Sequence, residues 1–313
     1  MSGLPALRVT AAADFGQVGL LVGGDSAERE VSLDGGRAIA RSFERSGIRF
    51  QTFDGATGLF DAIGAGRIDR VFNLMHGPGG EDGAIQGALQ LMGTPITGTG
   101  VLGSALTMDK VRSKWLLQRL GIPTTAFELA GTPAADPAVI AERFGFPVFV
   151  KPAGLGSSIG ISKVELEADL PAAIALAREY GDEVLIEPAV RGGEYFAGVL
   201  GRQVLPLIRI ETPRAFYDYE AKYHSDLTRY FCPSGLAPEL EQRLQAQALQ
   251  AFDALHARGW GRVDFILDAQ QQPWFLEVNT VPGMTDHSLV PQAAAAIGVD
   301  FDELVWRILE TSL

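Results

Sequence analysis

The first hundred residues alternate short apolar runs with stretches of helical periodicity. The runs predicted as buried strands are Val18–Val22, Ile48–Phe53 and Val71–Leu74, and helices are expected from Ser32 to near Gly47 and from Gly83 to Met92. Strands that alternate with helices in this way favour a parallel βαβ arrangement. Ligands of such sheets bind beyond the carboxyl ends of the strands. The loops that begin at Gly23 and His76 fall at those ends.

The pattern changes in the middle of the chain. Asp109 is placed to cap a helix that ends before Gly121, and a second helix is expected near Ala168–Tyr180. The runs predicted as strands here are Val148–Lys151, Ile161–Val164 and Val184–Glu187. This block is predicted to be a separate, smaller α+β unit, and the expected domains are residues 1–100, 101–188 and 189–313.

The last third of the chain contains a second sheet and more helices. Tyr195–Leu200 and Val204–Arg209 are predicted to pair, and Phe216–Tyr230 is predicted to be a long ordered loop, a length that is usually functional. A helix over Pro238–Arg258 is expected to precede two further strands. Two C-terminal helices complete the predicted fold.

The most informative segment is a predicted hairpin from Gly261 to Asn279. If its turn is formed by residues 269–272, Asp264 lies opposite Glu277 and Arg262 opposite Asn279, all on one face, because side chains alternate along strands. A bulge would break this register. The other face is apolar and predicted to be core, with Val263, Phe265, Leu267, Trp274, Leu276 and Val278.

The polar face of this hairpin fits the chemistry of a metal site. Two carboxylates and an amide offer the oxygen ligands that Mg²⁺ prefers, and Mg²⁺ usually shares its coordination with phosphate. Arg262 beside them suits a phosphate oxygen. The alternative interpretation is a solvated carboxylate pair with Arg262 as its counter-ion.

Several glycine-containing loops offer further candidate sites. The loop that follows Lys151 places Ser157 and Ser158 where backbone N–H groups and hydroxyls could bind phosphate, although a plain hairpin turn has the same composition. Gly283 offers an N–H to an oxyanion, and Ser288 begins a helix, either as an anion ligand or as its N-cap. Residues 98–103 match a dinucleotide motif, but we interpret them as a turn into a helix because no strong strand precedes them.

Composition and charge exclude other classes of protein. With 47% hydrophobic and 20% charged residues the chain can build a core. The net charge of −12 and the absence of a basic run argue against a nucleic-acid partner. Cys232 is the only cysteine, which excludes an intramolecular disulfide. Without a signal-peptide pattern or a long apolar run, we expect a cytoplasmic location and no membrane contact.

Seven segments in one consistent order resemble the D-alanine–D-alanine ligases of the ATP-grasp superfamily. They are Gly-Gly-Asp-Ser-Ala-Glu-Arg-Glu-Val-Ser, Met-His-Gly-Pro-Gly-Gly-Glu-Asp-Gly, Met-Asp-Lys, the Lys151 loop, Phe-Tyr-Asp-Tyr-Glu-Ala-Lys-Tyr, Gly-Arg-Val-Asp and Glu-Val-Asn-Thr-Val-Pro-Gly-Met-Thr. The resemblance implies a three-domain ATP-grasp fold of class α/β and α+β, with an N-terminal parallel α/β domain, a central lid and a C-terminal catalytic domain. ATP is expected between the last two domains.

The resemblance also implies an activity and its cofactors. An ATP-dependent ligase of this family joins two D-alanines through an acyl phosphate, for peptidoglycan precursor synthesis. It implies two Mg²⁺ ions with Mn²⁺ as a substitute, K⁺ as a further ion, and a homodimer.

Site residues follow from the resemblance by position. The nucleotide and metal set is Lys110, Lys151, Ser158 and Lys222 for the phosphates, Glu187 and Glu194 for the adenosine end, and Asp264, Glu277 and Asn279 for the metal. The D-alanine set is Glu28, His76, Ser288 and Leu289 for substrate binding, with Arg262 and Gly283 for the oxyanion. Glu28, Ser157 and Tyr223 form an implied trio that closes the site.

Two alternatives remain open at this point. A related ligase could use D-serine or D-lactate as acceptor; Tyr223 favours the dipeptide, and a Tyr223→Phe change is expected to raise ester formation. A non-catalytic nucleotide-binding protein should have lost at least one of the metal-face residues or Lys222, and all are present. The general base for the attacking amine is open among Tyr223, the phosphate and a water.

Overall fold

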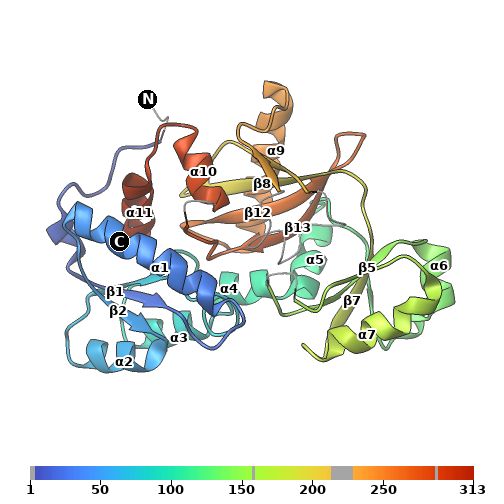
Figure 1. Ribbon diagram of the computed structural model, residues 1–313, viewed down its shortest axis with the longest axis horizontal. Helices are drawn as coiled ribbons and strands as arrows, with labels where there is room; N and C mark the ends of the chain where they lie inside the picture. Colours follow the sequence, from blue (N-terminus) through green and yellow to red (C-terminus); the bar gives the residue numbers. More distant parts are fainter. Residues whose placement is uncertain (1–3, 157–158, 213–227, 286–287) are drawn as a thin grey trace.

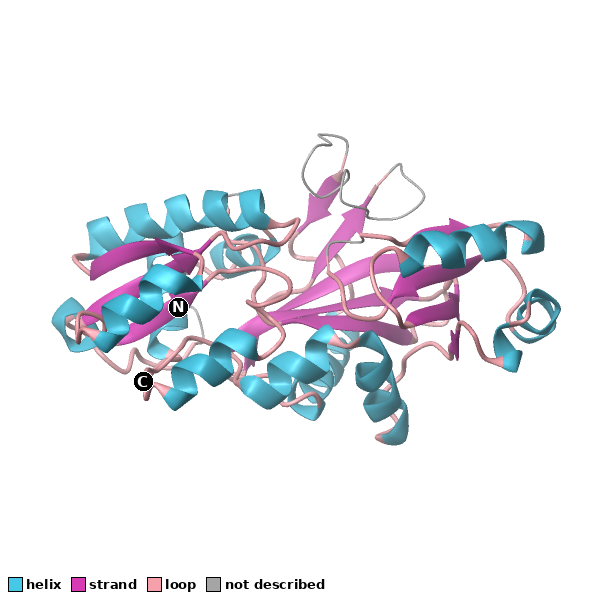
Figure 2. Ribbon diagram, turned by 90° about the horizontal axis from the view of Figure 1, so that it is seen from below, coloured by secondary structure: helices cyan, strands magenta, loops and turns pink. Residues whose placement is uncertain are grey.

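The computed structural model contains three β-sheets that follow one another along the longest axis of the molecule (Figure 1). It describes residues 4–156, 159–212, 228–285 and 288–313. Helices lie along the sheets and between them, as the view from below shows (Figure 2). No helix in the described ranges combines the length and the apolar character needed to span a membrane.

The N-terminal sheet is parallel, with strand order β2-β1-β3. Its strands are β1 (Gln17–Val22), β2 (Arg49–Asp54) and β3 (Arg70–Asn73), and its helices are α1 (Arg29–Ser46), α2 (Ala56–Gly64) and α3 (Ala84–Leu91). This confirms the predicted βαβ arrangement. Helix α1 begins before the expected Ser32 and ends at Gly47, whose φ of 70° suits a residue without a Cβ.

The middle sheet is antiparallel, with strand order β4-β7-β5-β6. Its strands are β4 (Glu128–Leu129), β5 (Val148–Pro152), β6 (Ser162–Val164) and β7 (Val184–Pro188), and α6 (Pro137–Arg143) and α7 (Leu170–Arg178) accompany them. Ile140, Val148, Leu170 and Ile186 belong to a buried core of this unit alone. Helices α4 (Val101–Met108) and α5 (Lys110–Arg119) connect the first sheet to it. Asp109 caps α5 by accepting the N–H of Arg112, as predicted.

The C-terminal sheet has the order β11-β10-β8-β12-β13, with β9 also on β8. Its strands are β8 (Gly193–Leu200), β9 (Gln203–Val204), β10 (Ile208–Glu211), β11 (Arg229–Phe231), β12 (Trp260–Leu267) and β13 (Pro273–Asn279). The strand predicted over Val204–Arg209 is two short strands, because Pro206 between them has no N–H for the ladder. Helix α9 (Pro238–Ala254) packs on one face of this sheet.

The predicted hairpin register is correct as far as the metal pair and then shifts by one residue. Arg262 pairs with Asn279 and Asp264 with Glu277, but Phe265 pairs with Phe275 because a bulge follows Asp264. The prediction that Trp274 and Leu276 belong to the core is therefore wrong. Phe275, 1% exposed, takes that place, while Trp274 and Leu276 are only partly buried.

The C-terminal helices return to the N-terminal sheet. Helices α10 (Leu289–Ala295) and α11 (Phe301–Glu310) share one hydrophobic core with β1, α1 and β8, and α11 lies beside α1 (Figure 1). The division into domains at residues 100 and 188 stays a prediction, because the first and third sheets share this core.

The segment before β1 packs against the last helix. The Glu310 carboxylate accepts the N–H groups of Arg8 at 2.6 Å and Val9 at 3.0 Å, and Phe15 packs edge-on against Trp306, with ring centroids 4.9 Å apart. These contacts hold the segment before β1 against α11.

Candidate functional site

A cavity of about 730 Å³ lies between the middle and C-terminal sheets. Strands β5 and β7 supply one wall, β12 and β13 another, and α5 closes the end. Six residues predicted from the sequence line it: Lys110, Lys151, Glu187, Glu194, Asp264 and Glu277. The bulge adds Leu276 beside Glu277 on the same cavity wall. The cavity therefore combines lysines, carboxylates and an apolar patch, as a nucleotide site requires.

The polar face of the β12–β13 hairpin is assembled as predicted. Arg262 donates to Asp264 through Nε–Oδ1 and Nη2–Oδ2 contacts, both 2.6 Å. The Arg262 guanidinium also lies over the ring of Phe196, 5.2 Å from its centroid. Stacking and a bidentate ion pair fix both side chains. Asp264 is 4% exposed, so its charge depends on such a partner.

The donor set fits a divalent cation that is shared with phosphate. Asp264, Glu277 and Asn279 present oxygen ligands on one face. In the described part of the chain no group of three or more His, Cys, Asp or Glu side chains could hold a metal. An ion at this face would therefore need Asn279 and oxygens from the nucleotide to complete its coordination.

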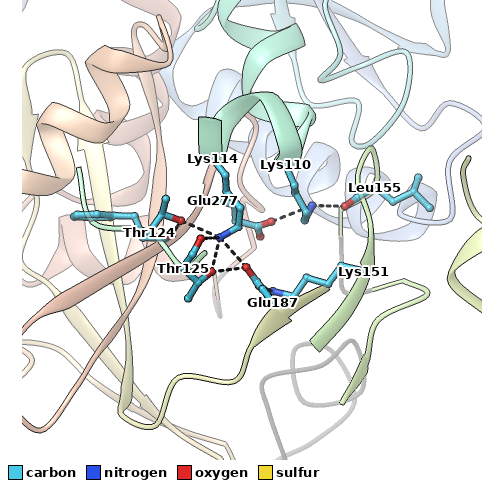
Figure 3. Close-up of polar contacts among 9 residues, drawn as sticks. Lys110, Lys114, Thr124, Thr125, Lys151, Leu155, Glu187 and Glu277 are labelled. Atoms are coloured by element: carbon cyan, nitrogen blue, oxygen red, sulfur yellow. Dashed lines mark hydrogen bonds and ion pairs between the residues drawn. The ribbon is translucent and has the colours of Figure 1, made fainter. Parts of the chain in front are cut away.

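Helix α5 brings two lysines to the cavity (Figure 3). Lys110 Nζ donates to the carbonyl of Leu155 at 2.5 Å and lies 3.3 Å from Glu277 Oε2. One turn later, Lys114 Nζ lies 2.7 Å from Glu187 Oε2. Sequence reasoning identified Lys110 and missed Lys114. The i, i+4 spacing of the two lysines was the signal available, because it places both on one helix face.

Glu187 is buried between two ammonium groups. Its Oε1 lies 2.5 Å from Lys151 Nζ, and its Oε2 accepts from Lys114 and from the Thr125 hydroxyl. Burial raises the pKa of Glu187, but Lys114 and Lys151 together outweigh it and hold the pKa far below its usual range. The carboxylate is therefore ionised and can act only as a hydrogen-bond acceptor.

The loop after β3 forms a second polar cluster. His76 is buried, with Nδ1 2.7 Å from the carbonyl of Leu74. Burial lowers the pKa of His76 more than the nearby Glu28 raises it, so the imidazole is neutral. Among the described residues, Nε2 of His76 has no hydrogen-bond partner. Its lone pair can therefore accept a hydrogen bond from a ligand.

Glu81 belongs to this cluster, and the sequence interpretation assigned it no role. Its carboxylate accepts the N–H of Gly77 at 2.6 Å. Burial first, and then the charge of Glu28, raise the pKa of Glu81 to about 8. Gly80, on the same loop, admits no Cβ, which would lie 1.9 Å from the Met75 carbonyl oxygen. The loop that carries His76 is thus closely packed.

The segment after β13 brings Gly283 against Ser288. A Cβ on Gly283 would lie 3.1 Å from Ser288 Oγ. Ser288 stands at the N-cap position of α10, yet its hydroxyl makes no capping bond and accepts the Thr285 N–H instead, at 2.9 Å. The side chain of Leu289 lies in the shared core, so its backbone alone is available to a substrate.

Four predicted site residues lie outside the described residues: Ser157, Ser158, Lys222 and Tyr223. Two members of the implied trio, Ser157 and Tyr223, are therefore not described, and neither are residues 216–227 of the predicted loop. These assignments stay predictions.

Comparison with known proteins decides the family. The family described as D-ala D-ala ligase C-terminus matches residues 116–310. The chain belongs to this ligase family. A D-alanine–D-alanine ligase from Nitrosococcus oceani is 52% identical over 299 residues, which cover 96% of this chain and 94% of the relative. Another from Halorhodospira halophila is 50% identical over the full length of both chains.

A solved structure of the same ligase family has the same fold. The VanG D-Ala:D-Ser ligase from Enterococcus faecalis is 29% identical, with a TM-score of 0.80 over 95% of this chain and 99% of its own. The ATP-grasp fold predicted from the sequence is confirmed. Membership of the ligase family implies the use of ATP and a divalent metal ion, and the oxygen donors on β12 and β13 fit such an ion.

Proposed function

We propose that this protein joins two molecules of D-alanine into D-alanyl-D-alanine at the expense of ATP, for peptidoglycan precursor synthesis. The observation that carries the proposal is the position of Arg262. Its guanidinium pairs with Asp264 at the metal face and also acts electrostatically on His76 in the second cluster. Arg262 therefore acts on groups of both clusters, the metal face and the His76 loop, and the phosphoryl group would pass beside it.

ATP would occupy the cavity between the middle and C-terminal sheets. Lys110 and Lys151 would bind the phosphates, together with Ser158 and Lys222. Glu187 and Glu194 would bind the adenosine end, and the partly buried Leu276 would contact the base. Lys110 and Lys151 each contact a carboxylate, so phosphate oxygens would replace these partners.

Asp264, Glu277 and Asn279 would hold two Mg²⁺ ions, with Mn²⁺ as a substitute and K⁺ as a further ion. When bound, these ions would neutralise the charge that develops on the transferring phosphoryl group. Arg262 adds a fixed positive charge, which its pair with Asp264 and its contact with Phe196 orient.

The first D-alanine would bind by its ammonium group to Glu28, with His76 accepting a hydrogen bond beside it. Its carboxylate would attack the γ-phosphorus of ATP, and the bond from that phosphorus to the β–γ bridging oxygen would break, giving an acyl phosphate and ADP. Water would have to be kept from that intermediate, which it would otherwise hydrolyse. Ser157 and Tyr223 would join Glu28 in closing the site.

The second D-alanine would bind by its carboxylate to Ser288 and to the backbone of Leu289. Its amine would attack the acyl carbon, and Arg262 with the Gly283 N–H would stabilise the oxyanion before phosphate leaves. The Ser288 hydroxyl makes no capping bond to α10, which is compatible with a hydrogen bond to the carboxylate of the second D-alanine.

We also propose a cytoplasmic homodimer and the three-domain division given above. Apolar side chains are exposed on the adjacent helices α3 and α4: Leu91 is 92% exposed and Leu102 is 56% exposed. A second copy would cover them. Sedimentation of the protein and of a Leu102→Glu variant tests this, and an unchanged monomer for both contradicts it.

The proposed activity is tested by phosphate release from Mg-ATP with D-alanine, L-alanine, D-serine or D-lactate, with products identified by mass. D-alanine-dependent release with a dipeptide product is expected. The relatives at about 50% identity are D-alanine–D-alanine ligases, whereas the VanG relative is named for D-serine. A mixed product with D-serine would move the assignment toward that relative. ATP binding without release for any acid would favour a non-catalytic protein.

A further inference from the structure

A buried lysine, Lys114, contacts the carboxylate of Glu187, which lines the nucleotide cavity. Lys114 is 2% exposed. Its Nζ lies 2.7 Å from Glu187 Oε2, 2.6 Å from Thr125 Oγ1 and 2.9 Å from Thr124 Oγ1 (Figure 3). A lysine ammonium has three donors, and each of them has an acceptor of good length here. Lys114 therefore has no donor left for a ligand.

The two oxygens of Glu187 have different environments. Oε2 is held by Lys114 and by the Thr125 hydroxyl, at 2.7 and 2.5 Å. Oε1 has Lys151 at 2.5 Å. The Lys151 side chain is 14% exposed and that of Lys114 is 3% exposed. One oxygen is thus fixed by the protein interior, and the other faces a lysine that solvent and ligands can reach.

The same cluster joins the elements around the cavity. Lys114 comes from α5 and Glu187 from β7, and the Thr124 hydroxyl donates to the carbonyl of Phe275 on β13 at 2.7 Å. Burial lowers the pKa of Lys114 and Glu187 opposes this effect. Removing either charge alone would leave the other buried without compensation, which is costly.

The role proposed for Lys151 has a consequence for Glu187. If Lys151 moves to the phosphates of ATP, Oε1 loses its partner while Oε2 keeps Lys114. A carboxylate oxygen in this state accepts a hydrogen bond from an amino group and repels a carbonyl oxygen. Adenine carries an exocyclic amino group, and hypoxanthine carries a carbonyl oxygen at the same ring position.

We propose that Lys114 is a positioning residue for nucleotide selection: it holds Glu187 ionised and oriented through Oε2, so that Oε1 accepts the amino group of adenine after Lys151 transfers to the phosphates. This inference rests on the proposed function for the placement of the base. It assigns Lys114 no contact with substrate. Nucleotide choice then depends on a side chain whose own hydrogen bonds are all within the protein.

The test compares affinities for ATP and ITP, which differ at that ring position. Calorimetric titrations would use the full chain and four variants: Lys114→Met, Glu187→Gln, the double variant with both changes, and Arg119→Met as the control. Arg119 is exposed on the same helix, so its change removes a charge without touching the cluster. The parent and the control are expected to prefer ATP.

Lys114→Met is expected to reduce the ATP-to-ITP preference roughly 10- to 100-fold, the range for a hydrogen bond to a charged group. In the Glu187→Gln background the same change should leave the ratio unaltered, because Lys114 acts through Glu187. A parent without ATP preference, an equal loss of affinity for both nucleotides in Lys114→Met, or a further change of the ratio in the double variant would each overturn the proposal.

Two features keep the test decisive. If Lys114→Met does not fold, the double variant, which removes both buried charges together, remains for comparison with Glu187→Gln, in which Lys114 keeps its bonds to Thr124 and Thr125. Binding is measured without D-alanine, whereas the proposed function is tested by D-alanine-dependent phosphate release. Selective ATP binding without turnover would therefore count against the proposed function and leave the role of Lys114 standing.

Discussion

Asp264 lies directly opposite Glu277 on β12 and β13, and the register of the two strands shifts immediately after this pair. The shift places Phe275 in the core and Leu276 beside Glu277 at the cavity. A β-bulge of this kind redirects side chains next to a functional site. The bulge therefore adds an apolar side chain to the cavity wall without disturbing the pairing of Asp264 with Glu277.

The alanine substitution at Phe275 should mainly reduce stability, and the one at Leu276 should mainly affect ATP use. Phe275→Ala is expected to destabilise the fold by about 3–5 kcal/mol, because it opens a cavity in the core. Leu276→Ala should cost about 1 kcal/mol and raise the KM for ATP several-fold, because its side chain is partly exposed at the cavity. Urea unfolding and steady-state kinetics check both. A larger stability loss for Leu276→Ala than for Phe275→Ala would indicate that Leu276 lies in the core, as it would if the two strands paired without a bulge.

Removing one carboxylate of the metal pair should abolish turnover. Glu277→Gln is expected to lower kcat by at least about 100-fold and to raise the Mg²⁺ concentration that activity requires. Addition of a chelator to the parent should likewise stop phosphate release. Asp253→Asn removes a partly buried carboxylate on α9 that pairs with Arg202, and serves as the control. Equal activity of Glu277→Gln and this control would contradict the metal assignment.

His76 should affect D-alanine and not ATP. His76→Asn removes the Nε2 acceptor and is expected to raise the KM for D-alanine about tenfold, with the KM for ATP changed little. Because burial lowers its pKa, His76 should stay neutral through pH 7, and its protonation should cause no break near pH 6.5. His256→Asn, at an exposed histidine, is the matched control. Steady-state kinetics with D-alanine and ATP varied separately would show whether the KM for D-alanine rises while the KM for ATP changes little.

The raised pKa of Glu81 makes stability depend on pH. The folded state keeps a proton on Glu81 from its ordinary pKa of 4.5 up to about 8, and the unfolded state does not. The contribution of Glu81 to the free energy of unfolding is therefore fully present below pH 4.5. It is lost as the pH rises towards 8, at up to about 1.4 kcal/mol per pH unit. Glu81→Gln should remove this component.

Urea unfolding at pH 5, 7 and 8.5 in metal-free buffer measures the Glu81 effect. The stability of Glu81→Gln relative to the parent should rise from pH 5 to pH 8.5. Parallel pH curves for the two proteins would show that Glu81 carries the same charge in the folded and unfolded states.

Much of this architecture could be predicted because local signals coincide with it. The apolar run at Val18–Val22 and the cap at Asp109 lie where the sequence places them. These features depend on neighbours within a few residues. Asp264 and Glu277 also meet as predicted, although the loop between their strands is one residue longer than predicted, because the bulge after Asp264 compensates for the extra residue.

The features that were missed depend on distant contacts. At the bulge, Phe275 donates its N–H to the carbonyl of Pro123 at 2.8 Å and its carbonyl accepts from Thr124, a pairing across about 150 residues. Glu81 and Lys114 look like ordinary charged residues in the sequence. Their importance comes from burial against Gly77 and Glu187, which only the assembled fold provides.

The hydrophobic core shared by β1, α1 and α11 also limits how parts of this enzyme can be exchanged between relatives. A chimera that joins residues 1–100 of one ligase to the remainder of another would place foreign side chains against α11 and lose the packing of both. The N-terminal sheet can be transplanted only together with α10, α11 and the face of β8 that packs in the same core, all from later parts of the chain. The middle sheet has a core of its own and can be exchanged as a continuous piece.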